Sequence, residues 1–258
     1  MLKKEPWEGY IKPSRMVGNL YFVGTHPAST HIIDTGAGLM MIDPAYQESL
    51  YLVLHNMWEL GLDPRELKYI FITHCHYDHS DATRALVELT GAKVCFPALD
   101  LPLLNGEIYH YPFKPFEPDI LLYDGDTVTL GNTTVRGVAT PGHTDGTMSY
   151  FFNVTDGDQT YRAAMHGGVG MNSMESAFLK ERGLSPLCRQ KFLEGLAKVE
   201  NEPVDIVVGN HVGQNDTEGK LARLGQPGPN PFVDPTEWSR FIEKHRQKLF
   251  LLQESDPC

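Results

Sequence analysis

The first part of the chain alternates short apolar runs with turns that contain Gly and Asp. The runs at residues 19–24, 30–34 and 38–43 are bounded by turn-forming residues, which predicts three consecutive strands. Between residues 46 and 60, apolar side chains recur at helical spacing, and Gly61 follows as a stop signal. We therefore expect a helix that covers one face of the sheet.

A second strand-to-helix junction carries the most distinctive residues of the chain. The β-branched and aromatic run at 69–73 predicts a strand, and residues 81–90 predict a helix that ends before Gly91. A histidine-rich segment lies between them. Residues 97–118 contain five prolines and many aromatic residues, so we predict an irregular loop or lid there.

The order of strands and then a helix recurs in the second half of the chain. Strands are expected at 126–130, 133–139, 147–152, 161–165 and 204–209, a helix from Ser185-Pro186 through Val199, and a last helix at about 238–249. This order predicts an α+β fold with two sheets flanked by helices.

The bulk composition limits the classes of function. A chain of 258 residues with 41% hydrophobic and 21% charged residues suits one large domain, and we expect a single domain over residues 1–258. No run approaches the roughly 18 apolar residues of a membrane span, and the chain starts without a signal-peptide pattern. This predicts a cytoplasmic protein, unless an export signal was removed. The formal net charge of −11 argues against nucleic acid and favours a small-molecule substrate, while the oligomeric state stays open.

The segment from His74 to His79 places four candidate metal ligands within six residues. If the chain stays extended after the strand, His74 and His76 point to the same side, because side chains alternate along a strand. Cys75 then points the other way, and we interpret it as a small buried thiol. Asp78 and His79 come at the turn into the helix, where they can present a second pair of ligands. The segment predicts a two-metal site.

Four segments together resemble sequences of the metallo-β-lactamase superfamily. They are the His-x-His-x-Asp-His segment after an apolar strand, Thr140-Pro-Gly-His-Thr-Asp-Gly146, Gly209-Asn-His211 and the strand-turn-strand at 34–43. The resemblance covers about residues 19–215 and implies a four-layer αββα sandwich, the metallo-β-lactamase fold. It also implies two metal sites, the first formed by His74, His76 and His143 and the second by Asp78, His79 and His211. Nitrogen and oxygen donors suit two zinc ions, with iron and manganese as alternatives.

The same resemblance implies a hydrolase. A metal-bound hydroxide between ions about 3.5–4 Å apart would attack the carbonyl carbon of an amide or ester bond, while one ion polarises the carbonyl oxygen. Asp78 would be the catalytic residue that orients the hydroxide and shuttles its proton. Asp43 would orient a ligand histidine from the side of the ring away from the metal, or would only form a turn, and both interpretations stay open.

The chain differs from several branches of the superfamily after the third histidine. Many branches, including glyoxalase II and the lactonases, carry a bridging aspartate there, whereas residues 163–170 contain no carboxylate. The ligand set therefore most resembles class B, subclass 3 metallo-β-lactamases, which implies β-lactam substrates. Lactones and thioesters are alternative substrates, and an iron-dependent redox protein is an alternative from another class.

Candidate substrate contacts are less sharply defined. His166 could reach the metal ions in place of the missing aspartate, bind substrate, or pack beneath the glycine-rich turn. Asn172 and Ser173 are candidate contacts for a substrate carboxylate, and Tyr109 lies in the proline-rich segment that could roof the pocket. Four further histidines have no such support and are interpreted as ordinary: His26, His31, His55 and His245.

Overall fold

Seven strands from the first half of the chain form one mixed sheet. The fold is that of a computed structural model, which describes residues 5–108 and 115–257. The pairs from β1 to β4 are antiparallel, and the pairs from β4 to β7 are parallel. The strands lie in the sheet in chain order: β1 (Ser14–Val17), β2 (Leu20–Phe22), β3 (His31–Asp34), β4 (Leu39–Ile42), β5 (Leu67–Phe71), β6 (Lys93–Pro97) and β7 (Ile120–Leu122).

Helices make the crossovers that parallel strands require. They are α1 (Leu50–Glu59) between β4 and β5, α2 (Tyr77–Ser80) and α3 (Thr83–Thr90) between β5 and β6, and α4 (Leu101–Leu104) after β6. Short 3-10 turns are η1 (Pro6–Gly9), η2 (Gln47–Ser49), η3 (Pro64–Glu66), η4 (Ala98–Asp100) and, in the second half, η5 (Asn172–Met174).

Five strands from the second half form the other sheet, in the order β12-β11-β10-β9-β8. Their bounds are β8 (Thr127–Leu130), β9 (Thr133–Ala139), β10 (Met148–Asp156), β11 (Gln159–Met165) and β12 (Ile206–Val208). Only the pair of β11 and β12 is parallel among the pairs described. The helices here are α5 (Ser176–Arg182), α6 (Leu187–Val199), α7 (Thr217–Arg223) and α8 (Glu237–Ser255).

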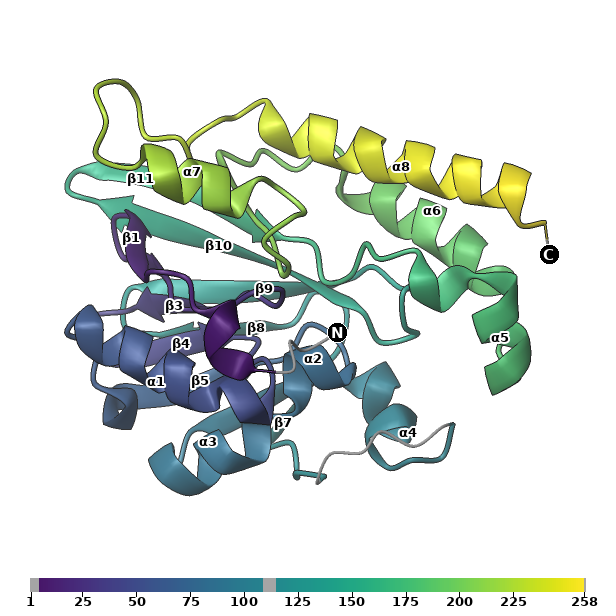
Figure 1. Cartoon of the computed structure of the whole chain (residues 1–258), viewed down its shortest axis with the longest axis horizontal. Coiled ribbons are helices and arrows are strands. Elements are labelled where there is room, and N and C mark those ends of the chain that lie inside the picture. The colour runs from purple at the N-terminus through teal and green to yellow at the C-terminus, as the bar shows by residue number, and fades with distance from the viewer. Residues whose placement is uncertain (1–4, 109–114, 258) are drawn as a thin grey trace.

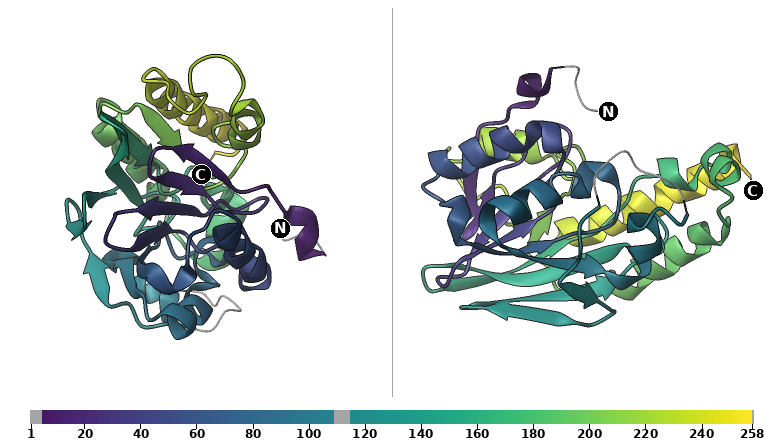
Figure 2. Two further views of the ribbon diagram at one scale, coloured as in Figure 1. Left: turned by 90° about the vertical axis from the view of Figure 1, so that its left-hand side faces the viewer. Right: turned by 90° about the horizontal axis from the view of Figure 1, so that it is seen from below.

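The two sheets face each other, and helices cover their outer faces. Successive residues of β10 show this alternation: Tyr150 and Phe152 belong to the core that contains Phe71 of the first sheet, whereas Phe151 packs with Trp238 of α8. Such alternation is expected of a strand buried on both faces. α1 and α3 lie on one outer side, and α8 runs alongside α6 on the other (Figures 1 and 2). The predicted four-layer α+β sandwich is confirmed.

One contact ties the two sheets together directly below the histidine-rich segment. The rings of Phe71 and Tyr150 meet edge to face with centroids 5.4 Å apart, and the Tyr150 hydroxyl donates a hydrogen bond of 2.6 Å to the carbonyl oxygen of Ile72. Burying a ring of this size stabilises the fold by about 1.5–3 kcal/mol. These contacts hold the end of β5 at a fixed distance from the second sheet.

The structure contains elements that the sequence pattern did not predict, namely β1, β6, β7, α4, α5 and α7. The predicted irregular loop at 97–118 is wrong over residues 97–104, because Pro97 ends β6 and the residues after it form η4 and α4. Pro102 fits a helix there because it stands in the first turn, where its missing N–H would have no partner. Within the described residues, no helix is long and apolar enough to cross a membrane.

Candidate metal centre

The histidine-rich segment begins where β5 ends, at the carboxyl edge of the parallel strands. His74 and His76 point to one side of the extended chain and Cys75 to the other, where its thiol is fully buried in the core beneath α3. His76 keeps an extended backbone (φ −89°, ψ 148°) and precedes the first turn of α2. The turn then brings Asp78 and His79 round to the same edge.

A first group of three imidazoles forms here, and His143 joins it from a distant part of the sequence. The candidate ligand atoms of His74, His76 and His143 all lie within 4.8 Å of one another. The ring centroids are 4.6–4.7 Å apart, and the rings meet edge to face. Nε2 of His74 is buried and has no hydrogen-bond partner. A buried nitrogen without a partner is costly, and a metal ion at this point would satisfy it.

A second group lies beside the first and mixes nitrogen with oxygen. The candidate ligand atoms of Asp78, His79 and His211 also lie within 4.8 Å of one another. Nε2 of His79 is 3.2 Å from Nε2 of His211, and Oδ2 of Asp78 is 3.6 Å from each of these nitrogens. Both donor sets fit zinc, which binds imidazole and carboxylate in groups of three or four ligands.

Hydrogen bonds behind the ligands fix how the rings are turned. Oδ2 of Asp43 lies 2.8 Å from Nδ1 of His79, which leaves Nε2 of that ring for the centre. Nδ1 of His143 lies 2.9 Å from the carbonyl oxygen of Gly170 and 2.8 Å from Oγ of Ser173. Such partners commonly set the tautomer and orientation of metal-binding histidines. Asp43 thus lies behind a candidate ligand, His79. It also stands in a turn, where its own φ is 52°.

Asp100, which no sequence pattern singled out, links the two loops that carry the first group. Its side chain is fully buried and accepts hydrogen bonds from the backbone N–H of Cys75 (2.7 Å), the hydroxyl of Thr144 (2.9 Å) and the N–H of Gly146 (2.7 Å). Burial raises the pKa of this carboxyl to about 6. Asp100 follows β6, and because that strand was not predicted, there was no reason to place Asp100 near the ligands.

The charge state of the ligands suits a cation. Burial, followed by the neighbouring histidines, holds the pKa values of His74 and His76 well below the ordinary value. Burial likewise lowers the pKa of His143 and of His211 to about 4. These rings are neutral at pH 7 and can donate lone pairs to a metal. Burial acts to raise the pKa of Asp78, but the neighbouring histidines outweigh it and lower that pKa to about 2.

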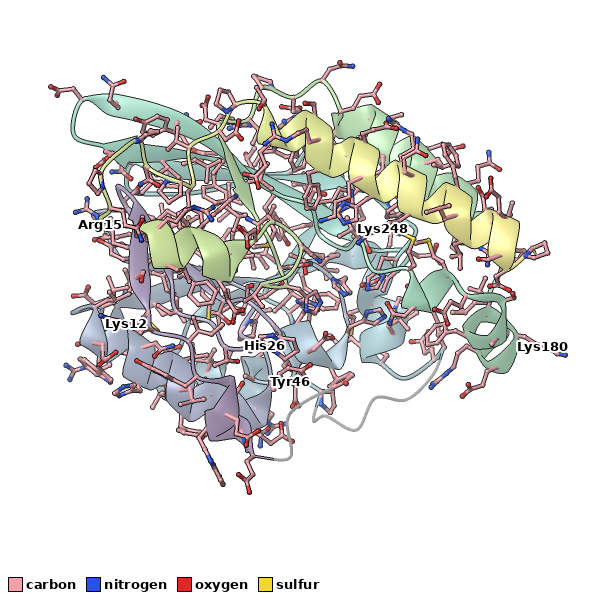
Figure 3. All side chains as sticks on the ribbon, turned by 45° about the horizontal axis from the view of Figure 1, so that its top comes forward. Lys12, Arg15, His26, Tyr46, Lys180 and Lys248 are labelled. Atoms are coloured by element: carbon pink, nitrogen blue, oxygen red, sulfur yellow. The ribbon has the colours of Figure 1, made fainter. Side chains whose placement is uncertain are left out.

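A cavity of about 430 Å³ opens over both groups. Its wall includes Tyr46 (labelled in Figure 3), Asn172 and Arg182. Ser173 lies behind His143, where its hydroxyl contacts Nδ1 of that ring and donates to the His143 carbonyl oxygen.

His166 lies elsewhere, buried between the rings of Phe192 and Phe241 at centroid distances of 6.1 and 6.5 Å. It is not among the described residues that line the cavity over the ligands. Of the predicted substrate contacts that the structure describes, Asn172 alone lies on that wall. Tyr109 lies outside the described residues.

Comparisons with known proteins place the chain among sequences of one superfamily. The family model described as the metallo-β-lactamase superfamily matches residues 23–156. A curated relative, the probable polyketide biosynthesis zinc-dependent hydrolase PksB of Bacillus subtilis, is 32% identical over 114 residues, which is 44% of this chain and 45% of the relative. The match therefore spans less than half the length of that relative.

Two solved structures are similar over nearly their whole length. The native FEZ-1 metallo-β-lactamase from Legionella gormanii superposes with a TM-score of 0.87 at 27% identity, covering 95% of this chain and 97% of the other. The subclass B3 metallo-β-lactamase BJP-1 of Bradyrhizobium japonicum gives a TM-score of 0.82 at 26% identity, covering 96% and 97% of the two chains.

Proposed function

Because this chain belongs to the metallo-β-lactamase superfamily, we propose that it is a zinc-dependent hydrolase that binds two zinc ions and opens the amide bond of a β-lactam. The observation that carries the proposal is the pair of adjacent ligand groups, each with three donors within 4.8 Å of one another. The likeness to β-lactamases along 95% of the chain supports the choice of substrate class.

His74, His76 and His143 would hold one ion, and Asp78, His79 and His211 the other. When bound, zinc supplies an activated water molecule and polarises a carbonyl oxygen. The remaining work belongs to the side chains. Asp78 stays ionised, since its pKa lies near 2, and its free lone pairs can accept a hydrogen bond from the attacking water and orient it.

Residues behind the ligands and on the cavity wall have separate roles. Asp43 and Ser173 hold the rings of His79 and His143 in place, which keeps the donors aimed at the ions. The side-chain amide of Asn172 on the cavity wall can donate a hydrogen bond to a substrate carboxylate. Arg182 adds a positive charge to the same wall, which favours an anionic substrate in a chain of net charge −11.

A second candidate function is hydrolysis of an ester-like bond, in a thioester or a lactone. The name of the relative PksB concerns polyketide biosynthesis and not β-lactams, and the same ligand geometry serves attack on any of these carbonyl groups. That name also supports zinc over iron or manganese, and with it hydrolysis over redox chemistry.

The test combines metal content with turnover. The purified protein is analysed for zinc, iron and manganese, and hydrolysis of a chromogenic cephalosporin is followed before chelation, after chelation and after zinc is restored. We expect two zinc ions per chain and activity that chelation abolishes and zinc restores. His211→Ala should lose activity while His55→Ala, an exposed histidine, should not. Two zinc ions without cephalosporin turnover would direct the search to thioesters and lactones, and bound iron would contradict the proposal.

A further inference from the structure

A short helix carries part of the wall of the cavity over the ligands. α5 contributes Phe178 and Arg182 to that wall, and η5, just before it, contributes Asn172. α5 has seven residues, of which only Leu179 is buried. An isolated helix of this length is not stable in water, and one buried side chain does little to fix its position. The position of α5 therefore depends on contacts at its ends.

The residue that follows α8 makes such a contact at the start of α5. Oδ2 of Asp256 accepts a hydrogen bond of 2.7 Å from the backbone N–H of Ser176, and Oδ1 accepts one from the Ser176 hydroxyl. The first N–H groups of a helix have no partner within the helix, so the carboxylate satisfies one of them. The end of α8 lies beside the start of α5 (Figure 1). Asp256 stays attached to α8, because its own N–H donates to the carbonyl oxygen of Leu252 at 2.7 Å.

Arg189 of α6 joins the same carboxylate to the segment before α5. Its Nη2 lies 2.9 Å from Oδ2 of Asp256, and its Nη1 donates to the Asp256 carbonyl oxygen at 2.6 Å. Its Nε donates to the carbonyl oxygen of Met174 at 2.9 Å. Met174 follows Ser173, whose hydroxyl contacts Nδ1 of His143. A continuous set of bonds thus runs from the end of α8 to the segment that carries the cavity wall.

The charge on Arg189 makes this connection depend on Asp256. Arg189 is only 4% exposed, and Asp256 is its ion-pair partner. A buried guanidinium is costly without an opposite charge, so its bond to the Met174 carbonyl would not persist unchanged once that partner is neutral. The bonds at Ser176 would weaken at the same time. One substitution should therefore loosen the η5–α5 segment at two points.

We propose that Asp256 is a positioning residue for substrate binding, which holds Phe178 and Arg182 of α5 in the wall of the cavity over the ligands. The inference rests on the proposed hydrolase function, because it takes a substrate to occupy that cavity. Asp256 is not among the described residues that line the cavity, and it acts through Ser176 and Arg189. Its loss should weaken substrate binding and leave both ions in place, because none of the six candidate ligands lies on α5.

The first experiment measures KM and kcat of zinc-loaded Asp256→Asn with a chromogenic cephalosporin. We expect KM to rise about tenfold, since a small misplacement of a binding group is costly, while kcat changes less than about threefold and two zinc ions stay bound. A rise in KM at constant kcat is the signature of lost substrate binding. Asp234→Asn is the matched control. Asp234 also accepts bonds from a backbone N–H and a hydroxyl, both of Thr236, and pairs with Arg240, but at the other end of α8, so KM should not change.

Hydrogen exchange separates this inference from the hydrolase proposal. Amide exchange is measured in the zinc-loaded protein without substrate. In Asp256→Asn the amides of α5 should exchange at least about tenfold faster, while those of α1 and β5 keep their rates. This result supports the position of α5 as dependent on Asp256 even if no cephalosporin is hydrolysed.

Three outcomes overturn the inference. They are unchanged exchange in α5, loss of a zinc ion from Asp256→Asn, and an unchanged KM in a protein that hydrolyses the cephalosporin. If Asp256→Asn does not fold, Ser176→Ala takes its place, because it removes one bond to the same carboxylate and leaves the ion pair with Arg189 intact. The same direction of change in KM and in α5 exchange is then expected, with smaller size.

Discussion

Asp43 and His79 form a buried pair in which the carboxylate Oδ2 lies 2.8 Å from Nδ1 of the ring. The same carboxylate accepts hydrogen bonds from the backbone N–H and the hydroxyl of Thr73, at 2.8 and 2.7 Å. Thr73 immediately precedes His74. The Asp43 carboxylate therefore connects the start of the ligand segment to His79 at its end. Burial acts to lower the pKa of His79, but Asp78 and Asp43 outweigh it and raise that pKa above its ordinary value.

Replacing Asp43 should weaken the second metal site. In Asp43→Asn the side chain keeps its size but loses the negative charge that orients His79, and such losses typically reduce metal affinity by about 10–100-fold. Zinc affinity is measured by competition with a chromogenic chelator. Asp34→Asn, at a partly exposed turn carboxylate that accepts only a local bond from Gly36, is the matched control and should bind zinc as the unchanged protein does. Equal affinity in the two variants would contradict the role given to Asp43.

Replacing Asp100 should weaken the first site, although Asp100 touches no ligand side chain. In the unchanged protein, the backbone N–H groups of Cys75 and Gly146 donate to the Asp100 carboxylate. Asp100→Asn replaces one carboxylate oxygen by an NH2 group, which cannot accept these bonds, so the connection between the loops that carry the first group is weakened. We expect a loss of about tenfold or more in affinity for one of two zinc ions. Asp119→Asn is the control, because Asp119 also accepts a backbone N–H bond, from Val94. The proposal fails if both variants release zinc at the same chelator concentration.

Removing one ligand from each group should remove one ion at a time. His143→Ala leaves the second group with its three donors, and His211→Ala leaves the first group with its three. Each variant should bind one zinc ion tightly, and its melting temperature in zinc should fall below that of the unchanged protein, because a ligand that binds only the native state adds to stability. Metal analysis after gel filtration and a thermal melt provide the two measurements. Loss of both ions in either variant would indicate a single shared site.

The features that could be predicted from the sequence are those set by local spacing. Alternation along a strand places His74 and His76 on one side, and the turn into α2 adds Asp78 and His79 within the same six residues. The layered fold could likewise be predicted from the order of strands and helices, because apolar periodicity decides which face each element buries. These predictions needed no knowledge of contacts between distant segments.

The remaining parts of the site depend on such contacts. Asp100 reaches Gly146 over 46 positions, and the strand that carries it to the ligands, β6, is only five residues long and ends in a proline. His166 had three open interpretations because the glycines after it show no apolar pattern, whereas its burial comes from Phe192 and Phe241, which belong to α6 and α8. The position of α5, a helix that was not predicted, likewise depends on a contact with the end of α8, 80 positions away.

The burial of His166 leads to a prediction about acid stability. Burial lowers the pKa of this ring to about 3, while the unfolded chain takes up the proton near pH 6.5. The unfolded state therefore binds one more proton between these values, and the free energy of unfolding falls as the pH falls below about 6.5. His166→Leu removes that proton uptake. The pH slope of the free energy of unfolding between pH 6 and 5 should become smaller by about 1.4 kcal/mol per pH unit.

Urea unfolding of the metal-free protein measures this slope. The other buried histidines and Asp100 also titrate in this range, but they are present in both proteins and cancel in the difference. His55→Leu is the matched substitution at an exposed histidine on α1, away from the glycine turn. Equal slopes for His166→Leu and the unchanged protein would mean that His166 takes up its proton in the native state, as a ring in contact with water in the metal cavity would. A reduced slope supports a neutral ring packed under the glycine turn, where it supports the loop that carries Gly170 to Nδ1 of His143.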